Sequence, residues 1–339
     1  MRRHGIWAAV LVALTAAATH ASSTPKKMTS CSLSKGDRAW LDHSVQSWIV
    51  TRRDILSAPS PASLEASIFD DRCALTSRTA LITGRSRWVS SPLKHRSITL
   101  GTQRIPVGVF SATIGDANGA HFYMSVPSVW AKAKIPPGKL GLDRLMTAVM
   151  MHEATHVFQR QTYGAQIDQI QKQNALTDDQ FNDDAIQSQF GKQAEFAASV
   201  QRETDLFFEA ATTANDGDAR RLALEARDLV RTRERRYFVG GQAYQVRAED
   251  LWLTMEGSAQ WAGFQWLQLP VAKCGGGLSA KDALADFGKR GGSWTQTLGL
   301  AVAMTVNRFQ PAGWKRHAFG DGRLTLLEML DQSLPRDRS

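Results

Sequence analysis

Cysteine is scarce in this chain and is never closely paired. The 339 residues contain three cysteines, Cys31, Cys73 and Cys274, none with a second cysteine at C-x-x-C spacing. This excludes a metal site built on paired thiolates and allows one disulfide with one thiol left over. We favour a Cys31–Cys73 bridge, which would tie the N-terminal arm to the predicted sheet, although Cys274 lies in a flexible glycine turn and competes for it.

Hydrophobic runs long enough to span a membrane are also absent. The apolar stretch from Ile6 to Ala18 follows Arg2-Arg3 and is too short to cross a bilayer comfortably. Thr19-His20-Ala21 then provides a small-residue cleavage site. This layout predicts a secretory signal peptide over residues 1–21, and therefore a secreted or periplasmic protein without an integral membrane segment after its removal.

Nucleic-acid-binding motifs are missing, although the composition is basic. The formal net charge is +9, and removal of the two signal-peptide arginines leaves +7 (9 − 2). The surplus arginines are spread over several segments, which is typical of a solvated basic surface. We expect no nucleic-acid partner, because an exported protein rarely meets one.

Five residues in the middle of the chain, His152-Glu153-Ala154-Thr155-His156, spell H-E-x-x-H. Positions i and i+4 share one face of a helix, so the two histidines can present ring nitrogens to one metal ion. Glu153 lies about 100° further round the helix, where it can reach a metal-bound water but is poorly placed to bind the metal. The apolar periodicity predicts a helix from Leu142 to Tyr163, closed by Gly164.

The segment after the motif offers no obvious third ligand. Gln159 and Thr162 occupy the positions at which the extended motif H-E-x-x-H-x-x-G-x-x-H has glycine and histidine. Residues 166–174 contain Asp168 as their one acid. Since catalytic zinc has three protein ligands and a water, we expect the third ligand on a separate helix.

Glu256 is the best candidate for that third ligand. It lies in a strongly apolar and aromatic segment, and the small Gly257 and Ala259 beside it would allow this helix to approach the His152 helix closely. Glu249 lies two turns earlier on the same face and is interpreted as a partner that orients a ligand histidine. The remaining rivals lie on charge-rich helices, where a solvated or ion-paired role is expected: Glu195, Glu203 and Glu209.

An H-E-x-x-H helix followed at long range by E-G-x-A resembles the gluzincin metallopeptidases. The order of segments over residues 65–335 is similar to that of uncharacterised secreted bacterial proteins of the minimal gluzincin type. The resemblance implies that His152, His156 and Glu256 bind zinc and that Glu153 is the general base. Gln260 departs from the pattern, because some members have an aspartate there.

The expected fold is α+β and mostly α, with a zincin-like arrangement. A small N-terminal sheet of three to five strands packs on the H-E-x-x-H helix, and a helical region follows. The resemblance implies an edge strand above the cleft, for which Ala120 to Val126 is a candidate, with an ordinary core strand as the alternative. Asp178 to Thr213 is predicted as one long helix. The expected divisions are residues 1–21 (signal peptide), 22–60 (N-terminal arm and helix), 61–164 (sheet plus active-site helix) and 165–339 (helical region supplying the third ligand).

The expected function is hydrolysis of peptide bonds in a peptide or protein substrate. Zn²⁺ would activate a water, and Glu153 would accept its proton. The donor that stabilises the oxyanion is left open among Tyr237, Tyr244 and His317. One alternative is a zinc-bound but weakly active or inactive peptidase-like protein that binds peptide or cell-envelope polymer. Another is a helical structural protein in which the motif is coincidental. Substrate, endo- or exopeptidase mode and oligomeric state stay open.

Overall fold

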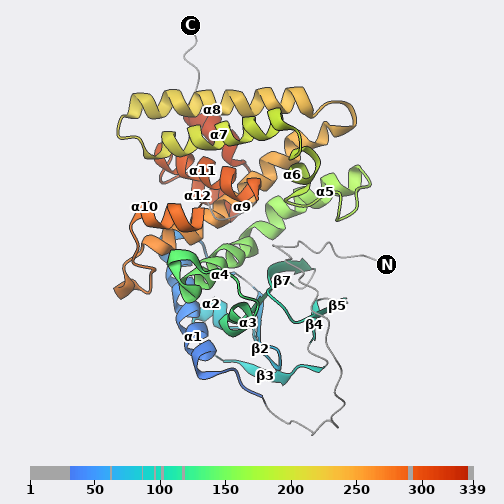
Figure 1. Cartoon of the computed structure of the whole chain (residues 1–339), viewed down its shortest axis with the longest axis vertical. Helices are drawn as coiled ribbons and strands as arrows, with labels where there is room; N and C mark the ends of the chain where they lie inside the picture. The colour runs from blue at the N-terminus through green and yellow to red at the C-terminus, as the bar shows by residue number, and fades with distance from the viewer. Residues whose placement is uncertain are drawn as a thin grey trace.

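The computed structural model describes residues 31–334, except residues 62, 86, 95–96, 101–102, 117–118 and 289–292. The predicted signal peptide, residues 1–21, lies outside the described residues. Figure 1 shows a lower part that contains the strands and the first helices, and an upper part of stacked helices built from the rest of the chain.

The first helix packs directly on the motif helix. Helix α1 (Lys35–Val50) continues as a π-helical turn, η1 (Thr51–Leu56), and the motif lies in α4 (Leu142–Gln159). The indole of Trp40 donates to the hydroxyl of Thr147 on α4 at 3.1 Å, and both groups are buried. The buried face of α1 is thereby turned towards α4.

The sheet before α4 has five strands in the order β3-β2-β1-β7-β6. The strands of this sheet are β1 (Leu64–Phe69), β2 (Cys73–Ser77), β3 (Val89–Pro92), β6 (Ser111–Asp116) and β7 (Gly119–Ser125). Strands β1 and β7 are parallel, and the other neighbours are antiparallel. A separate hairpin is formed by β4 (Ser97–Leu100) and β5 (Gln103–Pro106). The short helices of this part are α2 (Ala80–Thr83), α3 (Pro127–Lys132) and η3 (Gly138–Leu140).

The assignment of residues 120–126 as the edge strand is wrong. Residues 120–125 belong to β7, which lies between β1 and β6, so the alternative of a core strand holds. The edge strands are β3 and β6, and the first residue of β6, Ser111, pairs with Met124 of β7. Register between strands is a long-range property, and residues 120–126 alone could not distinguish an edge position from an internal one.

Gly164 does not close the motif helix as predicted. Helix α4 passes into a π-helical turn, η4 (Arg160–Gly164), and then into α5 (Ala165–Gln173). Gly164 keeps helical dihedral angles, with φ −57°. A glycine that ends a helix usually has a left-handed conformation, which this one does not adopt.

The remainder of the chain is helical. Its elements are α6 (Ala185–Phe190), α7 (Ala194–Thr212), α8 (Asp216–Tyr237), η5 (Gly240–Gln242), α9 (Tyr244–Gln268), η6 (Val271–Lys273), α10 (Ala280–Ala283), η7 (Leu284–Gly288), α11 (Trp294–Phe309), α12 (Trp314–Arg316), η8 (His317–Asp321) and α13 (Leu326–Ser333). The prediction of one helix over residues 178–213 is wrong, because turns and the short α6 precede α7. The described residues therefore form an α+β fold that is mostly α, with its small mixed sheet near the N-terminus.

Helix α9 lies at the centre of the helical part and is buried over most of its length. Two glycines set its distances to its neighbours. A Cβ at Gly263 would lie 2.9 Å from the carbonyl oxygen of Ala148 on α4, and one at Gly257 would lie 2.2 Å from the carbonyl carbon of Gly299 on α11. The close approach to α4 was predicted, but Gly263 permits it, whereas Gly257 faces α11.

The predicted disulfide is confirmed, because Cys31 and Cys73 are bonded and Cys274 is free.

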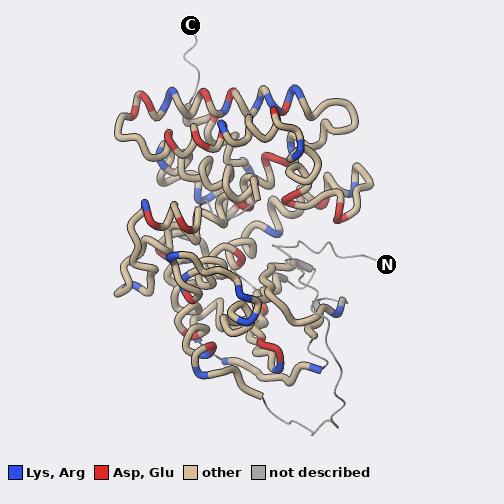
Figure 2. Tube along the Cα trace, viewed as in Figure 1, with Lys and Arg blue, Asp and Glu red and all other residues tan. Residues whose placement is uncertain are grey.

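None of the described helices has an apolar stretch of the length that a bilayer span requires. Figure 2 shows basic and acidic residues interspersed along the helices, most clearly on α8. The charge of this helix is therefore mixed along its length.

Candidate metal centre

The two motif histidines lie side by side on α4. Their Nε2 atoms are 3.2 Å apart, and their rings meet edge to face with centroids separated by 4.9 Å. His152 and His156 are both buried, with exposed fractions of 4% and 9%. The spacing of four residues produces this arrangement, since it places one ring above the other along the helix.

Glu256 approaches the histidines from α9. One carboxylate oxygen lies 3.2 Å from Nε2 of His152, and the other lies 3.5 Å from Nε2 of His156. One donor atom from each residue lies within 4.8 Å of the other two, and within the described part of the chain this is the single cluster of that kind. The structure thus brings together the three residues selected from the sequence, as a group that could hold a metal ion.

The surroundings of the two imidazoles fit a metal ion. Nδ1 of His152 lies 3.0 Å from the amide oxygen of Gln260, and Nδ1 of His156 lies 2.8 Å from that of Gln159. A neutral histidine that donates from Nδ1 has an unshared electron pair on Nε2. Two such pairs and a carboxylate converge on one point, where they repel one another unless a cation or protons lie between them.

The charges of the cluster act in the same direction. Burial opposes ionisation of Glu256, but the neighbouring His156 and His152 outweigh it and hold the pKa of this carboxyl well below its usual range. Burial also opposes charging of His152, yet the hydrogen bond and charge of Glu256 raise the pKa of that imidazole. The centre therefore favours a negative carboxylate facing positive charge, which a divalent ion bound by two neutral imidazoles would supply.

Glu153 is held beside this group by the edge strand of the sheet. The hydroxyl of Ser111 donates to its carboxylate at 3.1 Å, and the hydroxyl of Thr113 donates to its backbone carbonyl at 2.6 Å. Both hydroxyls come from β6, so the sheet fixes the motif helix at this residue. Burial raises the pKa of Glu153, while the histidines of the motif oppose the shift.

Two glutamines complete the centre, and both appeared in the sequence as departures from zinc-site patterns. Gln260 follows Glu256 by one turn on α9, and Gln159 follows His156 on α4. A third glutamine, Gln296 of α11, donates to the carboxylate of Glu256 at 3.4 Å. No local sequence pattern marked Gln296, because its position depends on the packing of α11 against α9.

Asp183 is a carboxylate near the centre that sequence reasoning missed. It lies in the turns between α5 and α6. Burial, followed by the charge of Glu256, raises the pKa of Asp183 well above its usual range, and Glu153 adds to the effect. The acidic stretch around it is typical of a solvated turn, so nothing local distinguished this aspartate from its neighbours.

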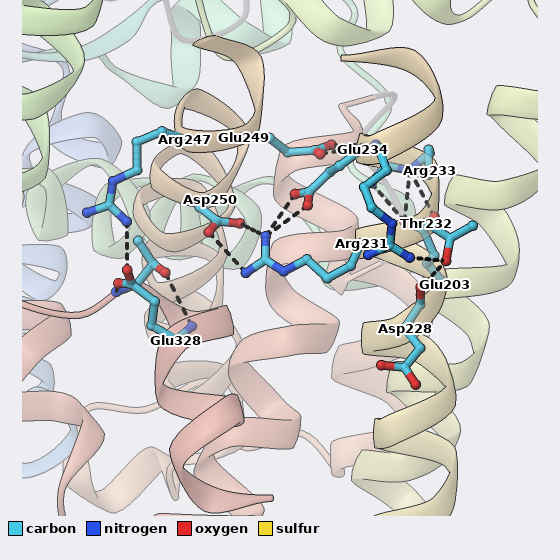
Figure 3. Close-up of polar contacts among 12 residues, drawn as sticks. Glu203, Asp228, Arg231, Thr232, Arg233, Glu234, Arg247, Glu249, Asp250 and Glu328 are labelled. Carbon is cyan, nitrogen blue, oxygen red and sulfur yellow. Dashed lines mark hydrogen bonds and ion pairs between the residues drawn. The ribbon is translucent and has the colours of Figure 1, made fainter. Parts of the chain in front are cut away.

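Glu249 does not orient a ligand histidine, contrary to the interpretation from the sequence. It binds Arg233 of α8 with two contacts of 3.0 Å. The same guanidinium binds Glu203 of α7 at 2.8 to 3.1 Å, so Glu203 is a buried ion-pair residue. Figure 3 shows Arg233 between these carboxylates and Arg231 between two others, Glu234 and Asp250. This buried cluster fastens α9 to α7 and α8 two turns before Glu256.

The contacts found for the three candidate oxyanion donors are with residues outside the centre. Tyr237 belongs to an aromatic cluster with Phe190 and Phe196. Tyr244 packs on Phe181, and Nδ1 of His317 pairs with Asp321 at 2.7 Å. The other two predicted rivals of Glu256 lie at the surface, where Glu195 pairs with Arg236 and Glu209 is exposed.

Comparison of the chain with models of protein families, with curated protein sequences and with solved structures finds no match. The resemblance to gluzincins therefore depends on the residues of this chain and on how its structure places them.

Proposed function

We propose that this chain is an exported, zinc-dependent peptidase of the gluzincin type. The observation that carries the proposal is the convergence of His152, His156 and Glu256, with Glu153 held beside them by β6. Two imidazoles and one carboxylate form a known ligand set of catalytic zinc, which keeps a further position for water or substrate. The sheet, the motif helix and the later helix with its glutamate support the zincin-like arrangement.

Zinc in this set would lower the pKa of a water to about 7 and polarise the carbonyl of a peptide bond. Glu153 is the group of this chain that would accept the proton of the attacking water and return it to the leaving amine. Its raised pKa suits this exchange, since a general base works best with a pKa near the operating pH. Ser111 binds one carboxylate oxygen and would leave the other for the reacting water.

The near-complete burial of the centre favours the second candidate function, a zinc-bound protein with little or no peptidase activity. The exposed fractions are 4% for His152, 3% for Glu153, 9% for His156 and 7% for Glu256. A peptide bond must reach these groups before it can be cleaved. A protein that keeps its centre closed would bind peptide or cell-envelope polymer without cutting it.

Cleavage of a peptide library, measured together with zinc content, separates these candidates. We expect the wild type to bind zinc and cleave, and Glu153→Gln to keep its zinc while losing about 10²- to 10⁴-fold in rate. The matched control is Glu195→Gln, because that residue is exposed and binds Arg236 at the surface. Equal rates for Glu153→Gln and the wild type would refute the assignment of the base. A wild type that holds zinc and cleaves nothing would establish the second candidate, and one that binds no zinc would end both.

A further inference from the structure

Each ligand histidine is backed by a chain of hydrogen bonds that runs through a glutamine. Behind His152, the amide nitrogen of Gln260 donates to the backbone carbonyl of Phe287 at 3.3 Å. Behind His156, the amide nitrogen of Gln159 donates to the hydroxyl of Ser258 at 2.6 Å. That hydroxyl donates in turn to a backbone carbonyl of α9 at 2.6 Å.

The carbonyl at the end of the first chain fixes its direction. A carbonyl only accepts hydrogen bonds, so Gln260 must turn its NH₂ group towards Phe287 and its oxygen towards His152. The reverse orientation would place two acceptor oxygens against each other. His152 is therefore held as the tautomer with hydrogen on Nδ1, and Nε2 is left to face Glu256. The second chain is less strictly fixed, because the hydroxyl of Ser258 can rotate.

The glutamine performs this task without adding charge. A carboxylate in the same place would also accept the Nδ1 hydrogen, would make the imidazole a stronger donor, and would add a negative charge near the ion. With Gln260, two imidazoles bound to a metal in their neutral form and Glu256 would supply a single negative charge among the three ligands. A divalent ion would retain a net positive charge on this set.

We propose that Gln260 is a positioning residue that holds His152 for metal binding and, being neutral, keeps the affinity of the centre below that of a carboxylate-backed one. This inference rests on the metal centre of the proposed function. It predicts opposite effects for two substitutions at a single position. Gln260→Leu removes the acceptor for His152. Gln260→Glu keeps that acceptor and adds the missing charge, and it gives up the hydrogen bond to the carbonyl of Phe287.

The test is a Zn²⁺ titration of the full chain against a competing chelator. We expect Gln260→Leu to weaken zinc binding by about 10- to 100-fold, the range seen when partners of ligand histidines are removed. Gln260→Glu should bind zinc more tightly than the wild type, because it adds a negative charge near the ion. Gln268→Leu is the matched control, because Gln268 lies two turns later on α9, donates to the carbonyl of Phe264, and should leave the affinity unchanged. Circular dichroism of each metal-free variant establishes that it is folded.

Two results would overturn the inference. One is a folded Gln260→Leu that binds zinc as tightly as the wild type, and the other is a folded Gln260→Glu that binds it no more tightly than the wild type. If Gln260→Leu fails to fold, the Gln260→Glu comparison still decides. A wild type without zinc affinity would defeat the proposed function, whereas a wild type that binds zinc with no difference between it and Gln260→Leu would defeat only the role of Gln260.

Discussion

Replacing Arg233 with leucine removes the cation that Glu203 and Glu249 share. The guanidinium donates five hydrogen bonds to these carboxylates, at 2.8 to 3.1 Å. The Arg233 and Glu203 side chains are fully buried, and that of Glu249 is 5% exposed. Breaking a buried ion pair from one side costs about 3–5 kcal/mol, because it leaves uncompensated charge in the interior. We therefore expect the free energy of unfolding of Arg233→Leu to fall by about that amount.

The triple variant Arg233→Leu/Glu203→Leu/Glu249→Leu is the matched comparison. It removes all three charges, and apolar replacements of buried ion clusters are often neutral or stabilising. We expect it to recover most of the stability that the single substitution loses. Urea unfolding followed by circular dichroism measures all three proteins. A loss below about 1 kcal/mol for Arg233→Leu, or a triple variant as unstable as the single one, would refute the reasoning.

The pH dependence of the deficit gives a second check. Burial already raises the pKa of Glu249, and Arg233 opposes that shift, so the pKa rises further when Arg233 is removed. A carboxyl whose folded pKa lies above its unfolded value stabilises the fold while protonated and loses that contribution as the pH rises. The deficit of Arg233→Leu should therefore be smaller at about pH 5 than at about pH 8. A deficit that grows towards acid would contradict this assignment.

Three further outcomes follow from the packing and the charges. Gly257→Ala places a Cβ 2.2 Å from a backbone carbonyl carbon of α11, and this overpacking should lower the free energy of unfolding by about 1–3 kcal/mol or more. The control is Gly241→Ala, whose Cβ meets no atom within 4 Å and should leave the free energy of unfolding unchanged. Equal stability of the two variants in urea would contradict it. Burial raises the pKa of Glu234 to about 8, so its contribution to stability is lost between its unfolded pKa and about pH 8. As the pH rises over that interval, the free energy of unfolding should fall less for Glu234→Gln than for the wild type. Parallel profiles of this free energy against pH for the two proteins would contradict the raised pKa of Glu234. The joint substitution Cys31→Ser/Cys73→Ser removes a disulfide between residues 42 apart in sequence and should lower the free energy of unfolding by about 2–4 kcal/mol. An unchanged urea midpoint would show that the bridge adds nothing to stability.

The local geometry of the centre could be predicted from the sequence. A spacing of four residues brings His152 and His156 together on any helix, and Glu153 follows from the same helical period. The apolar flank of Glu256 indicated that this carboxylate is buried and in need of a partner, and the structure places it against both histidines. The bridge from Cys31 to Cys73 was also favoured from the sequence, and the structure confirms it.

What the sequence could not supply depends on contacts between distant segments. Glu249 lies on the same face of α9 as Glu256, but its partner is an arginine of another helix. The edge position of β6 follows from the parallel pairing of β1 with β7, which no single strand encodes. The part played by Gln296 depends on the close approach of α11 to α9. Each of these features requires the three-dimensional packing before it can be recognised.

Equilibrium dialysis against zinc, followed by metal analysis, tests the metal centre most directly. The wild type should bind about one zinc ion per chain, and Glu256→Ala should lose it while remaining folded. Glu209→Ala is the control, because this exposed glutamate of α7 lies outside the centre, and the variant should keep the metal. Stoichiometric zinc in Glu256→Ala, or none in the wild type, would contradict the account.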